Sequence, residues 1–146
     1  GGYAFNSMRF EKMYRAWGSE FTEEISAVEA GMERFIDTSK SFIGSKNIEQ
    51  RIKKGIKIKL VFLVFDDEIA AECFGNEAVY SENKLVGLTT GGAYGHRVNK
   101  SLAFAYIDAD IVEAAKDLTV LTAAGERKCH IETQAIYDPK NKRLKA

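Results

Sequence analysis

The residues best suited to do chemistry in this chain are two histidines and two cysteines. His96, His130, Cys73 and Cys129 lie far apart, and none stands in an HxxxH or CxxC arrangement. A zinc-type site needs clustered ligands, and a nucleophilic Cys or Ser needs a neighbouring base. The sequence therefore predicts no metal site and no such nucleophile. We interpret the cysteines as buried thiols in a reducing compartment, with a disulfide as the alternative.

The most glycine-rich segment, residues 91–95, reads GGAYG. A phosphate-binding loop would continue with a GK[ST] pattern and a helix, whereas strand-like apolar runs flank this segment on both sides. We predict a tight turn with positive φ angles at the corner of a β-barrel. In the alternative, functional interpretation, the small residues let a ligand or a neighbouring domain approach the backbone, where Tyr94 and His96 present their polar tips.

The composition narrows the class of protein. Twenty-one basic residues balance twenty-one acidic ones, so the chain lacks the charge footprint of a nucleic-acid partner or a polybasic membrane anchor. No apolar run reaches the ~18 residues of a transmembrane helix, and the start has no signal-peptide pattern. We expect one globular domain, or one domain with a piece of another. The chain opens at Gly1 without a methionine, which we interpret as a processed or excised end.

Helical patterns dominate the first third of the chain, residues 1–54. The spacing of apolar residues and the capping patterns predict four elements there: an amphipathic helix over 3–17 ended by Gly18, a capped turn over 26–31, a strand over 32–36, and a solvent-facing connecting helix over 46–54 that begins at Ser45 and ends at Gly55.

The remainder of the chain, residues 55–146, has the short alternating runs of β-strands. Six strands are predicted, over residues 56–65, 77–80, 85–90, 101–107, 118–123 and 127–136. Residues 81–84, SENK, predict a hairpin turn. The fold class is therefore mainly β with an α-helical N-terminal segment, and six strands at this spacing indicate a small barrel. The basic tail after Pro139 is expected to lie over the surface or to fray.

Several motifs occur in the order of one known family. They are NSMRFEKMYRAWG at 6–18, VEAG at 28–31, FIG at 42–44, the run from Gly75 to Ile107, and DPKNKR at 138–143. Together they resemble the C-terminal part of the glycine-cleavage T-protein (aminomethyltransferase) family, in its dimethylglycine and sarcosine dehydrogenase branch. The likeness covers nearly the whole chain.

The resemblance implies a folate-dependent module of which this chain is the last part. Residues 1–54 would close the folate-binding middle domain and supply the connecting helix, and residues 55–146 would form the six-stranded aminomethyltransferase-type barrel. Tetrahydrofolate is the implied cofactor. In the dehydrogenase branch the FAD-binding half lies in an upstream domain, outside this chain. The implied location is the cytoplasm, or the mitochondrial matrix in a eukaryote.

The same resemblance suggests site residues. Arg9 is the first candidate for a folate contact, with a salt bridge as the alternative. Tyr94 is a second candidate, with a half-buried corner tyrosine as the alternative. Lys142 and Arg143 stand where relatives place a tail tyrosine near folate, but a solvated tail is the other interpretation. No catalytic residue is assigned, because the acidic residue next to folate lies upstream in the family.

Two functions follow from these observations. The first is a fragment of an enzyme that passes a one-carbon unit from an N-methylated glycine to tetrahydrofolate, partnered by the upstream domains and inactive alone. The second is a non-catalytic module for docking or homodimerisation through an apolar helix face, on which we place Tyr3, Phe5, Phe10, Met13 and Trp17.

Overall fold

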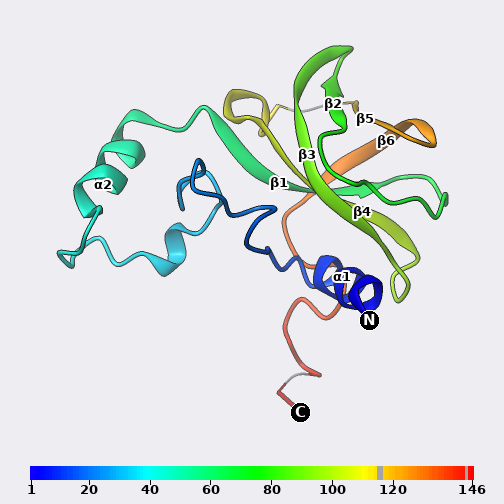
Figure 1. Cartoon of the computed structure of the whole chain (residues 1–146), viewed down its shortest axis with the longest axis horizontal. Helices are drawn as coiled ribbons and strands as arrows, with labels where there is room; N and C mark the ends of the chain where they lie inside the picture. The colour runs from blue at the N-terminus through cyan, green and yellow to red at the C-terminus, as the bar shows by residue number, and fades with distance from the viewer. Residues whose placement is uncertain (115–116, 144) are drawn as a thin grey trace.

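Six antiparallel strands close into a barrel with a short helix against its outside (Figure 1). This computed structural model describes residues 1–114, 117–143 and 145–146. The strands are β1 (Ile58–Phe65), β2 (Ala78–Ser81), β3 (Lys84–Gly95), β4 (Lys100–Asp108), β5 (Leu118–Thr122) and β6 (Gly125–Glu132), in the spatial order β1-β4-β3-β2-β5-β6. The predicted fold class is confirmed. Strand β6 ends at Glu132, four residues before the predicted end of the sixth strand at residue 136.

Strand β1 is apolar on both faces because each face packs against a different core. Val61, Leu63 and Phe65 belong to a cluster with members from all six strands, which fills the barrel. Leu60, Phe62 and Val64 alternate with them and join a second cluster that includes Phe10 of helix α1 (Gly2–Glu11). The side-chain period of two in a strand thus separates an inner core from an outer one.

Phe10 carries an aromatic contact between α1 and the barrel. It is fully buried, and its ring centroid lies 5.2 Å from that of Phe104 on β4. Phe104 in turn lies 5.1 Å from the ring of Phe62 on β1. Aromatic pairs at this spacing stabilise a core beyond the area that they bury. The ring of Phe10 thus joins the outer core, and the helix as a whole lies against β3 and β4.

The first helix ends six residues before the predicted end. Met13 adopts a left-handed conformation with φ 55°. The Tyr14 N–H donates to the Arg9 carbonyl at 2.9 Å, and the Met13 N–H donates to the Phe10 carbonyl at 2.8 Å. This is a Schellman motif. A methionine rarely occupies its left-handed position, so the sequence pointed to Gly18 as the end.

The segment between the first helix and the barrel is mostly irregular. Ser26 and Glu29 form the predicted capping box: the Ser26 N–H and hydroxyl donate to the Glu29 carboxylate at 2.8 and 2.7 Å. The predicted strand over 32–36 is wrong, because a 3₁₀ helix, η1 (Glu33–Phe35), occupies it. A second 3₁₀ helix, η2 (Ala109–Ile111), follows β4.

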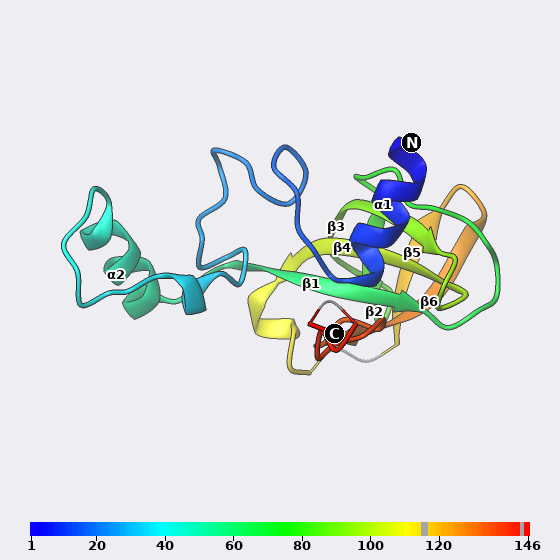
Figure 2. The ribbon, with the colours of Figure 1, turned by 90° about the horizontal axis from the view of Figure 1, so that it is seen from below.

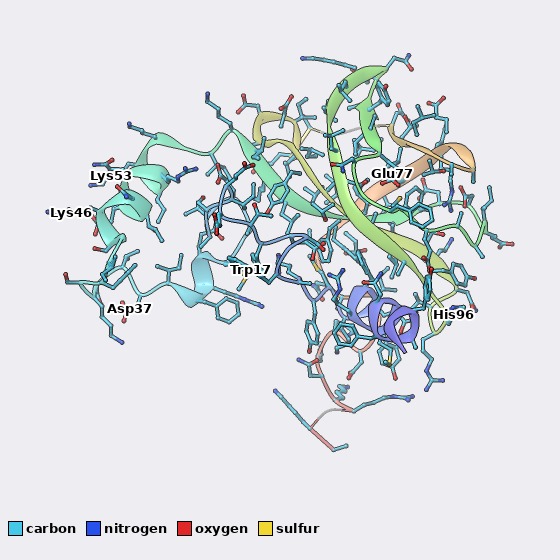
Figure 3. The ribbon with its side chains drawn as sticks, in the orientation of Figure 1. Trp17, Asp37, Lys46, Lys53, Glu77 and His96 are labelled. Carbon is cyan, nitrogen blue, oxygen red and sulfur yellow. The ribbon has the colours of Figure 1, made fainter. Side chains whose placement is uncertain are left out.

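The connecting helix α2 (Ser45–Lys54) forms where predicted and stands away from the barrel (Figures 1 and 2). Gly44 caps it in place of Ser45, and Gly55 follows it with φ 79°. None of its residues is buried. Figure 3 shows Lys46 and Lys53 on this outlying arm, on the side away from the barrel.

The glycine-rich segment is not the predicted corner turn. It lies inside β3, where it continues the pairing with β4 after a bulge between Thr89 and Gly91. The chain reverses at residues 96–99. Glycine is needed at Gly92 because a Cβ there would lie 2.6 Å from the Leu102 carbonyl oxygen. The hairpin predicted at residues 81–84 is confirmed. Glu82 and Asn83 have φ angles of 49° and 64°, which are typical of a type I′ turn.

Candidate functional site

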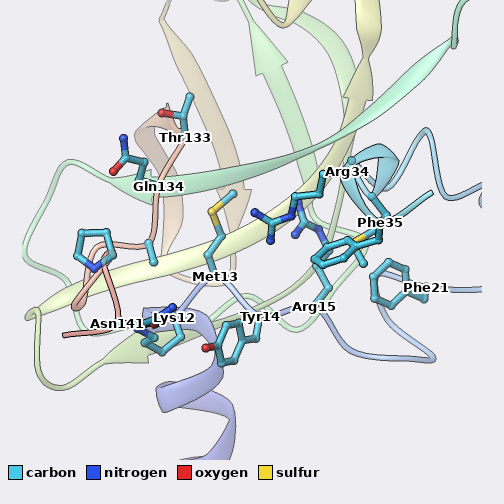
Figure 4. Close-up of a pocket in the computed structure, with 14 residues that line it drawn as sticks. Lys12, Met13, Tyr14, Arg15, Phe21, Arg34, Phe35, Thr133, Gln134 and Asn141 are labelled. Atoms are coloured by element: carbon cyan, nitrogen blue, oxygen red, sulfur yellow. The ribbon is translucent and has the colours of Figure 1, made fainter. Parts of the chain in front are cut away.

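Two hollows lie beside the first helix and the segment that follows it. The smaller, which we call the Arg9 hollow, has a volume of about 240 Å³. It is lined by Tyr3, Asn6, Arg9, Ser19, Glu72, Cys73, Phe74, Thr90, Gly91 and Gly92. The larger, which we call the basic hollow, has a volume of about 710 Å³ (Figure 4). It is lined by Lys12, Met13, Tyr14, Arg15, Phe21, Gly31, Met32, Arg34, Phe35, Thr133, Gln134, Ala135, Pro139 and Asn141.

Arg9 is held by a buried carboxylate. Its Nη1 lies 2.7 Å from Oε2 of Glu20, which is fully buried. The Glu20 carboxylate also accepts hydrogen bonds from the Thr90 hydroxyl at 2.8 Å and the Ala16 N–H at 2.7 Å. This arrangement matches the salt-bridge interpretation of Arg9. A contact with folate stays a prediction.

Asn6 connects Arg9 to the glycine strand. Its side-chain carbonyl accepts hydrogen bonds from Nε and Nη2 of Arg9 at 3.2 and 3.0 Å. Its amide nitrogen donates to the Gly92 carbonyl at 3.1 Å. The glycine segment therefore lets α1 approach β3 closely, which agrees with the interpretation that small residues admit a neighbour to the backbone. The neighbour seen here is a helix of the same chain.

Tyr94 does not share a hollow with Arg9. It lies half-buried on β3, where its backbone carbonyl accepts a hydrogen bond from the Ser7 hydroxyl at 2.7 Å. Its ring meets that of His96 edge-on, with 5.1 Å between centroids. Neither hollow includes Tyr94 in its lining. Its role in a folate site remains untested.

The C-terminal tail is attached to the end of α1. The Lys12 ammonium donates to the Asp138 carbonyl at 2.7 Å and to the Asn141 side chain at 2.6 Å. The Asp138 carboxylate accepts hydrogen bonds from the backbone N–H groups of Lys142 and Arg143. Both of these residues are exposed and line neither hollow. The start of the tail is therefore fixed in place, and the folate role of the two cations remains a prediction.

The sequence assigns no binding role to Arg15 or Arg34 and suggests only a helix pair of Arg15 with Glu11. In the structure the helix ends at Glu11, whose carboxylate accepts a hydrogen bond from the Arg97 N–H at 2.6 Å instead. Burial, and then the nearby charge of Arg34, lower the pKa of Arg15. The two arginines are nineteen positions apart, and the irregular segment between them gives no period from which their meeting follows. Only the early end of α1 and the 3₁₀ turn at residues 33–35 bring them together.

The barrel of this chain matches a known protein family. The family model described as "Glycine cleavage T-protein C-terminal barrel domain" matches residues 59–138, more than half of the chain. The chain belongs to this family. The match begins at the second residue of β1 and ends in the tail after β6, so it covers all six strands of the closed barrel except Ile58.

Relatives extend the similarity beyond the barrel. Mouse "Dimethylglycine dehydrogenase, mitochondrial" is 41% identical over 123 residues, which are 82% of this chain and 14% of the relative. Mouse "Sarcosine dehydrogenase, mitochondrial" is 30% identical over 158 aligned positions, 99% of this chain and 16% of the relative. The "Aminomethyltransferase" of Thermoanaerobacter pseudethanolicus is 27% identical, with 92% of this chain and 36% of the relative covered. The chain thus spans about one seventh of the length of the dehydrogenases.

A solved structure supports the fold of this T-protein barrel. The glycine cleavage system aminomethyltransferase T of Bartonella henselae superposes with a TM-score of 0.81 at 15% identity. The superposition covers 93% of this chain and 38% of that one. At this identity the likeness shows the shared fold.

The cysteines and histidines of the T-protein barrel sit in ordinary structural surroundings. Cys73 and Cys129 are buried free thiols, as predicted, and burial raises the pKa of each to about 12. They are therefore protonated near neutral pH, unlike reactive cysteines. His130 Nδ1 lies 2.6 Å from the Asp66 carboxylate, and both side chains are about half exposed.

Within residues 1–114, 117–143 and 145–146, no group of three or more His, Cys, Asp and Glu side chains is placed to hold a metal ion. No helix there combines the length and apolar character needed to cross a membrane.

Proposed function

We propose that this chain is the C-terminal part of a tetrahydrofolate-dependent enzyme of the dimethylglycine and sarcosine dehydrogenase type. The parent would pass a one-carbon unit from an N-methylated glycine to tetrahydrofolate, in the mitochondrial matrix if the organism is a eukaryote. The observation that carries the proposal is the 41% identity with mouse dimethylglycine dehydrogenase over 82% of the chain.

The domain division belongs to the same proposal. Residues 1–54 close the middle, folate-binding domain, and residues 55–146 form the barrel. Helix α2 supports this division because none of its residues is buried. Ile43 just before it is fully exposed, and Ile52 on it is about half exposed. Apolar side chains on an outlying arm favour a surface that upstream domains of the parent cover.

Tetrahydrofolate would supply the nitrogen atoms that accept the one-carbon unit. The residues described here fit only a partial contact with it. The Arg9 hollow, at about 240 Å³, is smaller than the ~300–1,000 Å³ typical of pockets that enclose a ligand. Arg9 already has Glu20 as its counter-ion, so it offers a folate carboxylate hydrogen bonds without net charge. We therefore expect the separate chain to be inactive and to bind folate weakly.

Calorimetry with tetrahydrofolate tests the first part of the proposal. The 146-residue chain should show no tight binding, because most of the folate contacts belong to upstream domains. A dissociation constant near about 1 µM would contradict this, since it corresponds to about 8 kcal/mol from this chain alone. FAD, if the parent uses it, would likewise bind upstream.

The coding sequence upstream of Gly1 tests the second part. An upstream GxGxxG pattern for FAD, followed by a YTGE segment for the pterin, would support the dehydrogenase parent. An in-frame start codon directly before Gly1 would contradict it, whatever the calorimetry showed.

A docking or homodimerisation module is the second candidate function. Tyr3, Phe5 and Met8 on α1 are exposed by 80%, 65% and 59%, which favours a covering partner. The face assumed from the sequence needs correction, because Phe10 is fully buried in the outer core and Met13 packs against that core. Trp17 lies beyond the helix.

A further inference from the structure

The basic hollow is built by three segments that are distant in the sequence. They are the turn after α1, the segment around η1 and the chain after β6. Figure 4 shows the guanidinium groups of Arg15 and Arg34 beside one another in this hollow, with Met13 next to them and the ring of Phe35 close by. The arrangement concentrates positive charge at one point.

No carboxylate among the described residues lines the hollow. Lys12 at its edge is already paired with Asp138 and Asn141. Glu20 and Glu33 act on Arg15 from nearby, but more weakly than Arg34 does, and Glu20 forms its ion pair with Arg9. Within the described part of the chain, neither Arg15 nor Arg34 therefore has a carboxylate in direct contact as its counter-ion.

Three other arginines of the chain have carboxylate partners, unlike Arg15 and Arg34. Arg9, Arg51 and Arg127 pair with Glu20, Glu29 and Asp67 at 2.6 to 2.8 Å. The side chains of Arg15 and Arg34 make no hydrogen bond or ion pair within the described part of the chain, and they lie over the rings of Phe104 and Phe35, respectively. The Nε atom of Arg15 is buried and has no hydrogen-bond partner. A guanidinium group offers five N–H donors, and an oxyanion can accept from two at once.

We propose that the basic hollow binds a small organic oxyanion, a carboxylate or phosphate ester carried on an apolar body. Arg15 and Arg34 bind the anionic group, and the rings of Tyr14, Phe21 and Phe35 pack against the apolar body. The volume of about 710 Å³ lies within the range of small-molecule sites. The proposal does not rest on the folate-dependent function, and it does not involve Arg9.

The charge of the two arginines and the aromatic walls of the hollow together favour a ligand that has both an anionic group and an apolar body. A bare anion would satisfy the arginines but leave the aromatic walls in water. A neutral apolar molecule would cover the walls and leave two like charges facing each other. A carboxylate on a ring meets both requirements, because its charge lies at one end and its apolar surface at the other.

NMR of the arginine side chains in the 146-residue chain tests the proposal at low ionic strength. Benzoate is the probe, benzamide is its uncharged analogue, and inorganic phosphate is the bare anion. We expect benzoate to shift the Nε–Hε signals of Arg15 and Arg34 saturably. Benzamide and sodium chloride at matched concentrations should produce no saturable shift. Phosphate should bind at least about tenfold more weakly than benzoate, because it has no apolar body.

Substitutions separate the site from general charge effects. Arg34→Gln should weaken benzoate binding by about tenfold, since each charge-assisted contact contributes on that scale. Lys46→Gln removes the same charge from the exposed α2 helix and should change the affinity less than about twofold, as expected for screened charges. Arg15→Gln should act like Arg34→Gln.

Three results would overturn the proposal. The first is unchanged benzoate affinity in Arg34→Gln, a substitution at an exposed position that leaves the core intact. The second is an equal loss of affinity in Lys46→Gln and Arg34→Gln, which would indicate general electrostatic attraction. The third is binding of phosphate or benzamide as tight as that of benzoate. Such binding would show that the apolar body or the anionic group is not needed.

Discussion

The carboxylate of Glu20 and the guanidinium of Arg9 form a buried ion pair at 2.7 Å that joins the first helix to the segment after it. Glu20 also contacts β3 through the Thr90 hydroxyl, and its backbone carbonyl accepts a hydrogen bond from the Tyr106 hydroxyl on β4 at 2.7 Å. Through its carboxylate and its backbone carbonyl, Glu20 therefore connects the helix, the irregular segment and two strands.

Replacing Glu20 with Gln should destabilise the chain strongly. The change leaves Arg9 in a buried place without its counter-ion, and breaking such a pair costs about 3–5 kcal/mol. Urea unfolding measures the difference. Glu23→Gln is the matched control, because Glu23 is exposed and should change the free energy of unfolding by less than about 0.5 kcal/mol. Equal effects of the two substitutions would show that Glu20 is not a structural centre.

The two thiols predict a loss of stability in alkaline solution. Burial raises the pKa of Cys73 and of Cys129 to about 12, whereas a thiol in the unfolded chain ionises near pH ~8.5. Above that pH the unfolded state releases protons that the folded state keeps. The free energy of unfolding should therefore fall from about pH 9 to pH 12, by up to about 1.4 kcal/mol per pH unit for each thiol.

Cys129→Ala isolates this effect from other groups that titrate in alkali. The substitution lowers the stability at every pH because it removes packed atoms. It should also make the decline above pH 9 shallower, since one of the two thiols is gone. A slope identical to that of the unsubstituted chain would contradict the assignment.

The barrel could be predicted from the sequence because its signals are local. Alternation along β1 and the hairpin at residues 81–84 depend on neighbouring residues only. The prediction failed where tertiary contacts decide the structure. Residues 3–17 have a helical period throughout, but the helix ends at Glu11. Two residues later, the left-handed Met13 turns the chain towards Glu20, which forms the ion pair with Arg9. Glu20 is itself held by Thr90, which is seventy positions further along the chain and outside any short window.

The candidate site shows the same division. Arg9 was singled out from a motif, and its alternative role as a salt-bridge partner is the one seen here. Arg15 stands in the same motif, where the sequence suggests a helix-supporting pair with Glu11. The helix ends at Glu11, so that pair does not form, and the place of Arg15 in the basic hollow depends on segments that are distant in the sequence. The high glycine content of residues 91–95 is visible in the sequence. The role of these glycines follows only from the structure, in which α1 approaches β3 through Asn6.

Gly92→Ala should destabilise the barrel through a clash with the backbone. The added Cβ would lie 2.6 Å from the Leu102 carbonyl oxygen and 3.0 Å from the Cys73 Cβ, so strands β3 and β4 would have to separate. We expect a loss of about 1–3 kcal/mol in thermal or urea unfolding. Gly2→Ala is the control, because no heavy atom lies within 4 Å of its added Cβ. If Gly92→Ala were as stable as the control, the close approach of β3 to β4 would be wrong.

The exposed apolar residues of α1 give the last prediction, which separates the two proposed functions. If the chain is a homodimerisation module, light scattering at about 100 µM should show a dimer, because each partner would need to bury several hundred Å² of apolar surface. Phe5→Glu with Met8→Glu should then restore the monomer without loss of stability, since both side chains are exposed. Lys46→Glu and Lys53→Glu on α2 form the control pair and should leave the dimer intact. A monomer in the unsubstituted chain would contradict the homodimer and favour upstream domains of a parent as the partner for this surface.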